Sequence, residues 1–414
     1  MKINNVEVKD LVAQYGTPIF VYDELKIKEN FRRVKTAFTS KYPDFKLYYA
    51  VKANNNPSIV KMLLAEGAGI DASSANEILL AKHLGLSGSD IIFSGNFLSD
   101  EDIKTGIENN VLFNLDDVSL LPRVLAFGQP EVLSFRINPG IGKSNVGHFD
   151  ITGGPEAKFG IHMDQAVEAY KQAKEAGVKR FGIHMMAGSC VTDASYFKEI
   201  TLRLFDVIGK IKKELAIDFE FVDLGGGLGI AYEPEESELD LDAAVTGIVE
   251  AIEAKCSEYT MPHPRVVMEP GRYFVANAGY LVGKVEAKKN AYREIWGTDL
   301  GMNIVPRVIL YDAYHALTVN GKENEKEFPK KPTLLTGQIC EQTDLWWKGR
   351  PLPELAIGDI VIMHNAGAYC FGMSYNYNGR LLPAEILVCE NGDTKIIRQA
   401  ETFEDTLRGT EKIT

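Results

Sequence analysis

Cysteine is scarce in this chain of 414 residues. The five cysteines, at positions 190, 256, 340, 370 and 389, are too few and too scattered for a disulfide framework, and no two of them have the CxxC spacing of a metal site. The seven histidines show no ligand spacing either. We therefore expect reduced thiols and no metal.

Positive charge and long apolar runs are also in short supply. Lys and Arg number 45 against 57 Asp and Glu, and the formal net charge of −12 argues against nucleic acid or an anionic membrane as the main partner. The first residues, MKINNVEVKDLVAQYG, contain no apolar signal core, and no apolar run approaches the roughly 20 residues of a membrane-spanning helix. We expect a cytoplasmic protein, long enough for two globular domains.

Short β-rich runs recur at a regular spacing. Five of them begin near Lys46, Gly69, Ile91, Leu112 and Val132, 20 to 23 residues apart with helix-like stretches between them, and three more begin near Arg180, Phe219 and Arg265. Pro57 stands where the first intervening helix would begin. Eight strands that alternate with helices predict an α/β barrel of the TIM type, in which reactive residues lie at the ends of strands.

The pattern changes beyond about residue 280. Strand-like runs without long helices predict a mainly antiparallel β-domain: YLVGKVEAKK, REIWGTDL, TLLTGQIC, DIVIMHNAGAY and AEILVCENG. We expect residues 1–24, with their own strand-like TPIFVYD, to dock on this domain, residues 25–280 to form the barrel, and residues 281–414 to form the β-domain. The charged stretch 321–332 is typical of a solvated loop.

Three of the predicted strands end in residues that suit one cofactor. They are KLYYAVKANNNP with Lys52, FEFVDLGGGLG with Gly225, Gly226 and Gly227, and RVVMEPGR with Glu269. An amine can hold an aldehyde as a Schiff base, glycine N–H groups can close on a phosphate, and a carboxylate can keep a pyridine nitrogen protonated. A lone strand lysine is usually a solvated charge and a lone GGG is usually a loop. Together, at strand ends, they predict a site for pyridoxal 5'-phosphate.

Further segments match a known family in order and spacing. The sequence resembles the alanine racemase-like barrel decarboxylases that use pyridoxal phosphate, and most closely the diaminopimelate decarboxylases, in YYAVKAN, GIDASSANE, IIFSGN, RINPG, DLGGGLGI, EPGRYFVANAG, CEQTD and NAGAYCFGMSYNYNGRLLPAE. The resemblance covers nearly the whole chain. It implies decarboxylation of meso-2,6-diaminopimelate to L-lysine, the last step of lysine biosynthesis, by a homodimer with shared active sites that join both domains.

The resemblance also implies a role for each matching residue. Lys52 would carry the cofactor, and Cys340 from the partner subunit would return a proton to the α-carbon; alone, Cys340 would more often be a small buried hydrophobe. The cofactor contacts would come from Lys52, Asp71, His184, Met186, Ser189, Gly225, Gly226, Gly227, Glu269, Gly271, Arg272 and Tyr369. The substrate contacts would come from Arg272, Arg307, Tyr311, Glu341 and Tyr369. Arg272 could instead bind the phosphate, and Tyr311 could instead be an aromatic residue of the core.

Two features bear on the reaction and the substrate. The resemblance implies that Glu269 favours decarboxylation, since the racemases of this fold would have an arginine beside the ring nitrogen. Arg307 and Glu341 offer opposite charges to one end of the substrate, which suits the amino-acid end of diaminopimelate and not the amine end of ornithine.

The chain departs from the family pattern at three places. Met186 replaces a histidine that stacks on the cofactor, CEQTD replaces CESGD, and NIVPRV replaces an NDLIRP-type segment. These changes keep other substrates open, among them carboxynorspermidine, ornithine and a glutamyl conjugate. A catalytically silent regulator that binds pyridoxal phosphate is the alternative from another class, and a racemase lacks the arginine it would need.

Overall fold

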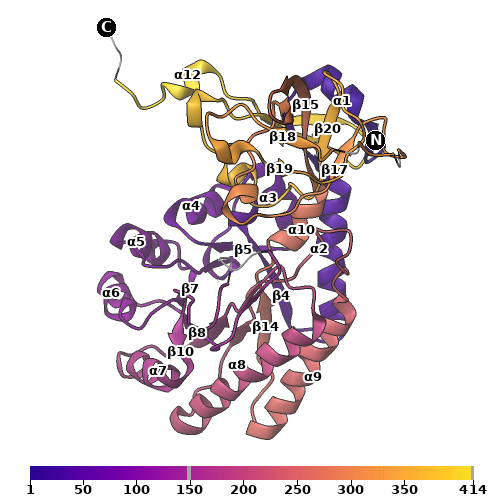
Figure 1. Cartoon of the computed structure of the whole chain (residues 1–414). Helices are drawn as coiled ribbons and strands as arrows, with labels where there is room; N and C mark the ends of the chain where they lie inside the picture. Colours follow the sequence, from indigo (N-terminus) through magenta and orange to yellow (C-terminus); the bar gives the residue numbers. More distant parts are fainter. Residues whose placement is uncertain (147–150, 326, 330, 412–414) are drawn as a thin grey trace. The chain divides into compact units, whose positions relative to one another are not determined.

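The computed structural model describes residues 1–146, 151–325, 327–329 and 331–411, and it divides the chain into two compact units (Figure 1). The barrel unit comprises Glu29–Ala231 and Ser237–Tyr273. The β unit comprises Met1–Lys28, Tyr232–Glu236 and Phe274–Thr414. Residues 326 and 330 of the expected solvated loop lie outside the described residues.

Eight parallel strands close into a ring in the barrel unit. The order around the ring is β8, β11, β13, β14, β4, β5, β6 and β7, and β7 pairs with β8 to close it. The strands are β4 (Phe45–Ala50), β5 (Gly69–Ala72), β6 (Ile91–Phe93), β7 (Leu112–Leu115), β8 (Leu133–Asn138), β11 (Phe181–Met185), β13 (Phe221–Asp223) and β14 (Arg265–Met268). Each begins within two residues of its predicted start. The prediction of a TIM-type barrel is therefore confirmed.

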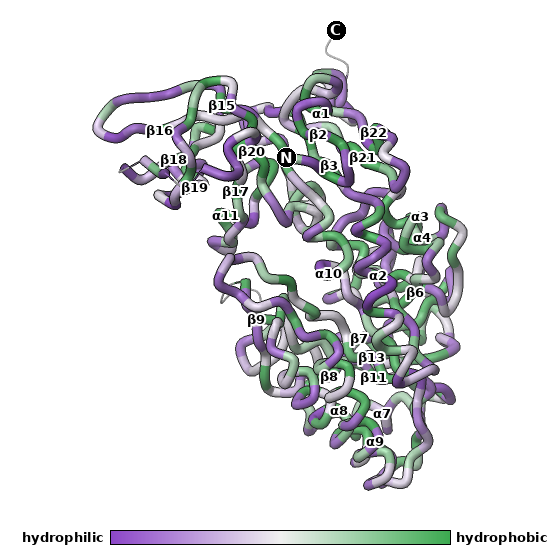
Figure 2. Tube along the Cα trace, turned by 90° about the vertical axis from the view of Figure 1, so that its right-hand side faces the viewer, coloured by the Kyte–Doolittle hydropathy of each residue, from purple (hydrophilic) through white to green (hydrophobic). Residues whose placement is uncertain are grey.

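Helix α2 (Glu24–Thr39) precedes the first strand of the ring, β4, and helices connect the strands that follow. They are α3 (Pro57–Ala65), α4 (Ala75–His83), α5 (Asp100–Glu108), α6 (Leu120–Phe127), α7 (Ala166–Glu175), α8 (Ala194–Leu215) and α9 (Leu241–Tyr259). Pro57 occupies the first turn of α3, as predicted, and the Asn56 side chain caps that turn by accepting from the backbone N–H of Ser58. The long helices α8 and α9 lie side by side in Figure 1, and their hydropathy alternates along the tube in Figure 2, because one face of each is buried.

Apolar side chains fill the end of the barrel where its strands begin. Six buried residues from different strands or their starts form one cluster there: Tyr48, Ile92, Leu112, Val132, Phe221 and Val267. This packing stabilises the barrel in the way expected for its N-terminal end. The opposite end, where the strands finish, is left for the polar residues of the predicted site.

The β unit contains a mainly antiparallel sheet, as predicted. Its path runs β19, β18, β16, β15, β3, β21 and β22, and β20 pairs with both β15 and β17. The bounds are β3 (Ile19–Asp23), β15 (Gly279–Asn290), β16 (Glu294–Thr298), β17 (Leu317–Val319), β18 (Leu334–Thr336), β19 (Trp347–Lys348), β20 (Ile360–Met363), β21 (Ala384–Val388) and β22 (Thr394–Arg398). The N-terminal TPIFVYD supplies β3, which lies between β15 and β21.

Candidate active site

Lys52 lies just past the end of β4, in the turn Val51–Ala53. Its Nζ is 2.8 Å from Oδ2 of Asp71, which comes from the neighbouring strand β5. Asp71 is fully buried, and its Oδ1 has no hydrogen-bond partner among the described residues. Burial, and then the negative charge of Glu269, raise the pKa of Asp71 to about 7 although Lys52 opposes the change. A half-exposed amine therefore stands beside a carboxyl that can hold or lose a proton near neutral pH.

The glycine run follows β13 and packs backbone against backbone. A Cβ at Gly226 would lie 2.7 Å from the carbonyl oxygen of Glu269, and a Cβ at Gly227 would lie 2.8 Å from that of Gly188. Gly227 also has a φ of +88°, which L side chains rarely adopt. Any larger residue would push these segments apart. The run thus forms a cradle with the backbone N–H groups that a phosphate needs.

Ser189, Arg272 and Met186 border the glycine run. The Nη2 of Arg272 donates to Oγ of Ser189 over 3.5 Å, so that a cation and a hydroxyl stand together. The backbone N–H of Gly226 donates to Sδ of Met186 over 3.1 Å. Because a thioether is a weak acceptor, a phosphate oxygen can replace it at this N–H group.

Glu269 lies in a buried polar cluster at the end of β14. Its Oε1 accepts from Ser94 Oγ over 3.1 Å, and its Oε2 is 3.3 Å from Nε2 of His184. Asn114 donates to Oδ2 of Asp223 over 3.2 Å and lies 3.5 Å from Glu269 Oε1. Three strands, β7, β11 and β13, and the residues just after β6 and β14 supply these five side chains.

Two buried carboxyl groups in this cluster cannot both ionise. Burial, together with the negative charge of Glu269, raises the pKa of Asp223 well above its ordinary value, so Asp223 keeps a proton. Burial would also raise the pKa of Glu269, but His184, the hydrogen bond from Asp223 and the charge of Lys52 lower it to about 2. Burial in turn lowers the pKa of His184. His184, the hydrogen bond from Asp223 and Lys52 together keep Glu269 an anion.

His184, Asp223 and Glu269 could also be read as metal ligands, since their donor atoms lie within 4.8 Å of one another. Both oxygens of Asp223 already accept hydrogen bonds, Oδ1 from the Gly225 N–H and Oδ2 from Asn114. A protonated carboxyl that is occupied in this way is a poor ligand. The anionic Glu269 instead suits a protonated ring nitrogen.

Gly271 and Arg272 follow Glu269 in the EPGR segment. A Cβ at Gly271 would lie 2.7 Å from Cβ of Ala53, so the glycine lets this segment approach the turn that carries Lys52. One end of the barrel thus brings together eleven of the predicted residues: Lys52, Asp71, His184, Met186, Ser189, Gly225, Gly226, Gly227, Glu269, Gly271 and Arg272.

The remaining predicted residues belong to the β unit. Arg307 begins the short helix α11 (Arg307–Leu310), and half-buried Tyr311 follows it. Tyr369 is also half-buried and has a φ of +56°. Cys340 and Glu341 lie on the turn after β18 and are exposed.

Arg307 is only 1% exposed and lies against Tyr232 and His315 within the β unit. Its Nη1 is 2.9 Å from Nε2 of His315, whose Nδ1 is 2.8 Å from the carbonyl oxygen of His364. Since Nδ1 must donate to that carbonyl, Nε2 accepts from Arg307 and His315 is neutral. The Tyr232 ring lies 4.8 Å from the guanidinium carbon. The Nη2 of Arg307 has no partner among the described residues.

The CEQTD turn is fixed by its buried aspartate. Asp344 accepts from the backbone N–H of Met302 over 2.7 Å and from that of Ile339 over 2.8 Å. These bonds present Cys340 and Glu341 on the outer side of the turn. Of the five cysteines, all of which are described, Cys340 alone is exposed, so the reading of Cys340 as a buried hydrophobe is wrong.

Several polar residues of the site were not among those predicted. Ser94, Asn114 and Asp223 surround Glu269, and Tyr232 and His315 surround Arg307. Ser94, Asn114 and Asp223 lie in or just after predicted barrel strands, and this position at the end of a strand could have identified them as site residues. Nothing in the sequence links Tyr232 to Arg307, because Tyr232 lies in a loop 75 residues before it.

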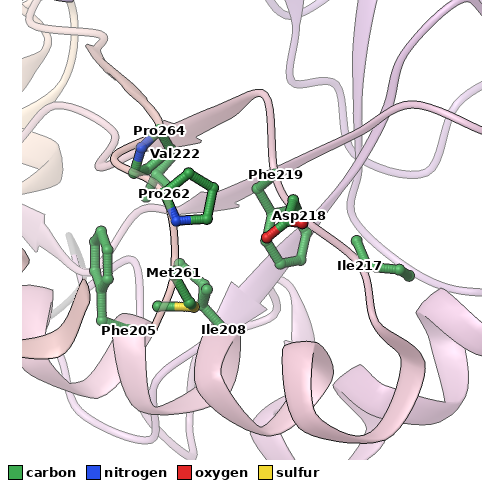
Figure 3. Close-up of a pocket in the computed structure, with 9 residues that line it drawn as sticks. All are labelled: Phe205, Ile208, Ile217, Asp218, Phe219, Val222, Met261, Pro262 and Pro264. Atoms are coloured by element: carbon green, nitrogen blue, oxygen red, sulfur yellow. The ribbon is translucent and has the colours of Figure 1, made fainter. Parts of the chain in front are cut away.

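Figure 3 shows a crevice that lies away from these residues. It is lined by α8 and by the segments that lead into β13 and β14, such as Phe205, Phe219 and Pro264, and hence lies at the N-terminal end of the strands. The space for the centre of a water molecule is only about 10 Å³, enough for roughly one water. It is no substrate site.

In the described part of the chain, no helix is long and apolar enough to cross a lipid bilayer.

Comparison with known proteins agrees with this geometry. Residues 25–276 match the family model described as "Pyridoxal-dependent decarboxylase, pyridoxal binding domain". The chain is 40% identical to a diaminopimelate decarboxylase of Methanothermobacter thermautotrophicus over 98% of this chain and 94% of the relative. It is 35% identical to the protein TabA of Pseudomonas amygdali pv. tabaci, over 96% and 91% of the two chains.

A solved structure gives the same picture. The diaminopimelate decarboxylase of M. jannaschii in complex with L-lysine superposes with a TM-score of 0.90 at 33% identity. The match covers 100% of this chain and 96% of the other.

Proposed function

Because the chain belongs to the pyridoxal-dependent decarboxylases, we propose that it converts meso-2,6-diaminopimelate to L-lysine and carbon dioxide with pyridoxal phosphate as its cofactor. The family match, the relatives named diaminopimelate decarboxylase and the lysine complex all support this reaction. They disfavour ornithine, carboxynorspermidine or a glutamyl conjugate as the substrate, and a silent regulator as the role.

The observation that carries the substrate proposal is the spare donor of Arg307. A buried guanidinium is normally paired with an anion. Among the described residues, that of Arg307 meets an imidazole and an aromatic ring, and its Nη2 has no partner there. A carboxylate of the substrate supplies both the missing charge and the missing acceptor. Glu341 offers a negative charge for the ammonium group at the same end of diaminopimelate. Tyr311 is assigned to this end of the substrate as well.

The barrel residues fit the cofactor. The glycine run, Ser189 and Arg272 would hold the phosphate, and the amine of Lys52 would hold the aldehyde group. When bound, pyridoxal phosphate withdraws electrons from the α-carbon as carbon dioxide leaves. Glu269, as the anion of the buried carboxyl pair, would keep a proton on the ring nitrogen and so increase that withdrawal.

Other residues move protons or complete the binding site. Asp71 exchanges a proton with the Lys52 amine, since its pKa of about 7 lies near the working pH. His184 and Met186 would lie beside the ring and the phosphate, and the resemblance to the family assigns the hydroxyl of Tyr369 to the phosphate. Cys340 gives its thiol proton to the α-carbon after carbon dioxide has left, and the electron pair of the S–H bond remains on sulfur.

We further propose that the protein acts as a homodimer in the cytoplasm, with Cys340 of one subunit serving Lys52 of the other. The resemblance to the family supports the shared site. The exposure of Cys340 and Glu341 supports it too, because a proton donor in open solvent would exchange with water rather than act on one carbon.

The test is carbon dioxide release by the purified, cofactor-saturated protein with meso-diaminopimelate, L-lysine, L-ornithine and carboxynorspermidine in parallel. We expect release from meso-diaminopimelate at a kcat/KM well above that for the other three. A preference for a substrate without a distal carboxylate would refute the assignment of Arg307 and leave the decarboxylase fold intact.

A further inference from the structure

Asn378 holds Cys340 through both ends of its side-chain amide. Its Oδ1 accepts from the backbone N–H of Cys340 over 2.8 Å, and its Nδ2 lies 3.1 Å from Sγ of the same residue. The orientation of the amide follows from chemistry, because a backbone N–H can only donate and must face the oxygen. The Nδ2–H group therefore donates to the sulfur.

Tyr377, which precedes Asn378, binds Glu341, which follows Cys340 in the CEQTD turn. The hydroxyl of Tyr377 donates to Oε1 of Glu341 over 2.8 Å. Two successive residues of the segment Tyr377–Gly379 thus bind two successive residues of the turn, Cys340 and Glu341. Asn378 has a φ of +56° and a ψ of 21°, a left-handed conformation that asparagine tolerates better than most residues.

We propose that Asn378 is a positioning residue that aims the thiol of Cys340 and stabilises the thiolate left after the proton transfer. This inference rests on the proposed function, in which the S–H bond breaks as a C–H bond forms at the α-carbon. An exposed cysteine side chain otherwise samples several χ1 rotamers, and only one of them points at a given carbon. A donor fixed on sulfur selects that rotamer, and it favours the ionised form more than the neutral one.

Two variants separate the contacts from the backbone conformation. Asn378→Asp keeps an oxygen for the Cys340 N–H but has no donor for the sulfur, and it adds a negative charge. Asn378→Gly adopts the left-handed conformation freely and removes both contacts. If Asn378 served only to form the turn, the glycine variant would behave as the wild type does. The matched controls are Asn110→Asp and Asn110→Gly, since Asn110 is exposed, has a φ of +52° and lies in the barrel unit.

The first readout is the rate at which iodoacetamide alkylates Cys340 in the holoenzyme, measured peptide by peptide across a range of pH. The other four cysteines are buried and serve as internal references. The pKa of Tyr377 is raised, chiefly by its hydrogen bond to Glu341. The hydroxyl of Tyr377 therefore stays neutral over the pH range of the alkylation series. We expect both Asn378 variants to slow the alkylation of Cys340 near pH 7 about tenfold.

The second readout is turnover of meso-diaminopimelate. We expect kcat to fall about tenfold in Asn378→Gly, with KM and cofactor absorbance unchanged, and to fall no further when the same change is made in a Cys340→Ala background. Alkylation at the wild-type rate in both folded variants would overturn the proposal. So would an equal loss of kcat in the Cys340→Ala background. If the wild type released no carbon dioxide, the proposed function would fail, and the alkylation series would still decide whether Asn378 holds the thiol.

Discussion

Replacing Arg307 with lysine should damage the recognition of the substrate far more than the binding of the cofactor. Lysine keeps the positive charge but has one donor centre where the guanidinium has a planar fork. Within the described part of the chain, Nη1 of this fork is bound to His315 and Nη2 has no hydrogen-bond partner. A lysine ammonium cannot serve His315 and a substrate carboxylate with the same geometry, and it also loses the stacking on Tyr232.

The size of the effect follows from burial. At 1% exposure, a lost charge-assisted hydrogen bond is not replaced by water. Truncating one partner of such a buried pair costs about 2 to 5 kcal/mol. In kcat/KM this corresponds to a loss of about 30-fold to several thousand-fold. The apparent affinity for pyridoxal phosphate should change by less than about twofold, since Arg307 is assigned no contact with the cofactor.

The assay compares wild type and Arg307→Lys on meso-diaminopimelate and L-lysine under cofactor saturation. Lysine lacks the distal carboxylate, so its slow decarboxylation, where measurable, should be nearly unchanged by the substitution. Thermal unfolding of both proteins controls for loss of structure, and His315→Gln, which keeps an acceptor for Nη1, is the matched variant. Wild-type kcat/KM for meso-diaminopimelate in a folded Arg307→Lys protein would refute the reasoning.

Three further predictions concern the barrel residues and the subunits. Borohydride reduction of the holoenzyme should fix a pyridoxyl group on Lys52, and peptide mapping that finds it on another lysine would contradict the assignment. Mixing Lys52→Ala and Cys340→Ala proteins should restore activity to about a quarter of the wild type, because random exchange makes half the dimers mixed and each has one intact site; no recovery after verified exchange would exclude a shared site. In the cofactor-free protein, the folded state binds the Asp71 proton more tightly than the unfolded chain, since the pKa rises from 3.8 to about 7. The stability from this group is complete below the unfolded pKa and is lost as pH rises through about 7. The free energy of unfolding should therefore fall between pH 5 and pH 8, and it should fall less in Asp71→Asn; equal slopes in the two denaturation series would count against the assigned shift.

The barrel could be predicted from the sequence because each strand is an apolar run at a nearly constant spacing. Parallel strands covered by helices are buried on both faces, so runs such as LYYA and IIF stand out. The edge strand β22, TKIIR, was not among the predicted strands, because its side chains are partly or fully exposed and its pattern lacks a buried face. Strand β17 was not predicted either, because its three residues are too few to show an alternating pattern.

The candidate site was predictable only in part. Lys52, the glycine run and Glu269 each carry a local signal, namely a reactive group at the end of a strand. The proton on Asp223 depends on its distance from Glu269, which is 46 residues away in sequence and close only after the barrel forms. Asn378 lies 38 residues from Cys340, and nothing in either local pattern links the two.

The most direct test of the whole account is the fate of meso-diaminopimelate labelled with ¹³C in its carboxyl groups, followed by NMR in the presence of the purified holoenzyme. We predict equal amounts of lysine and carbon dioxide, and neither product with Lys52→Ala. Epimerisation of the substrate without carbon dioxide release, or products that form equally well without Lys52, would contradict the account.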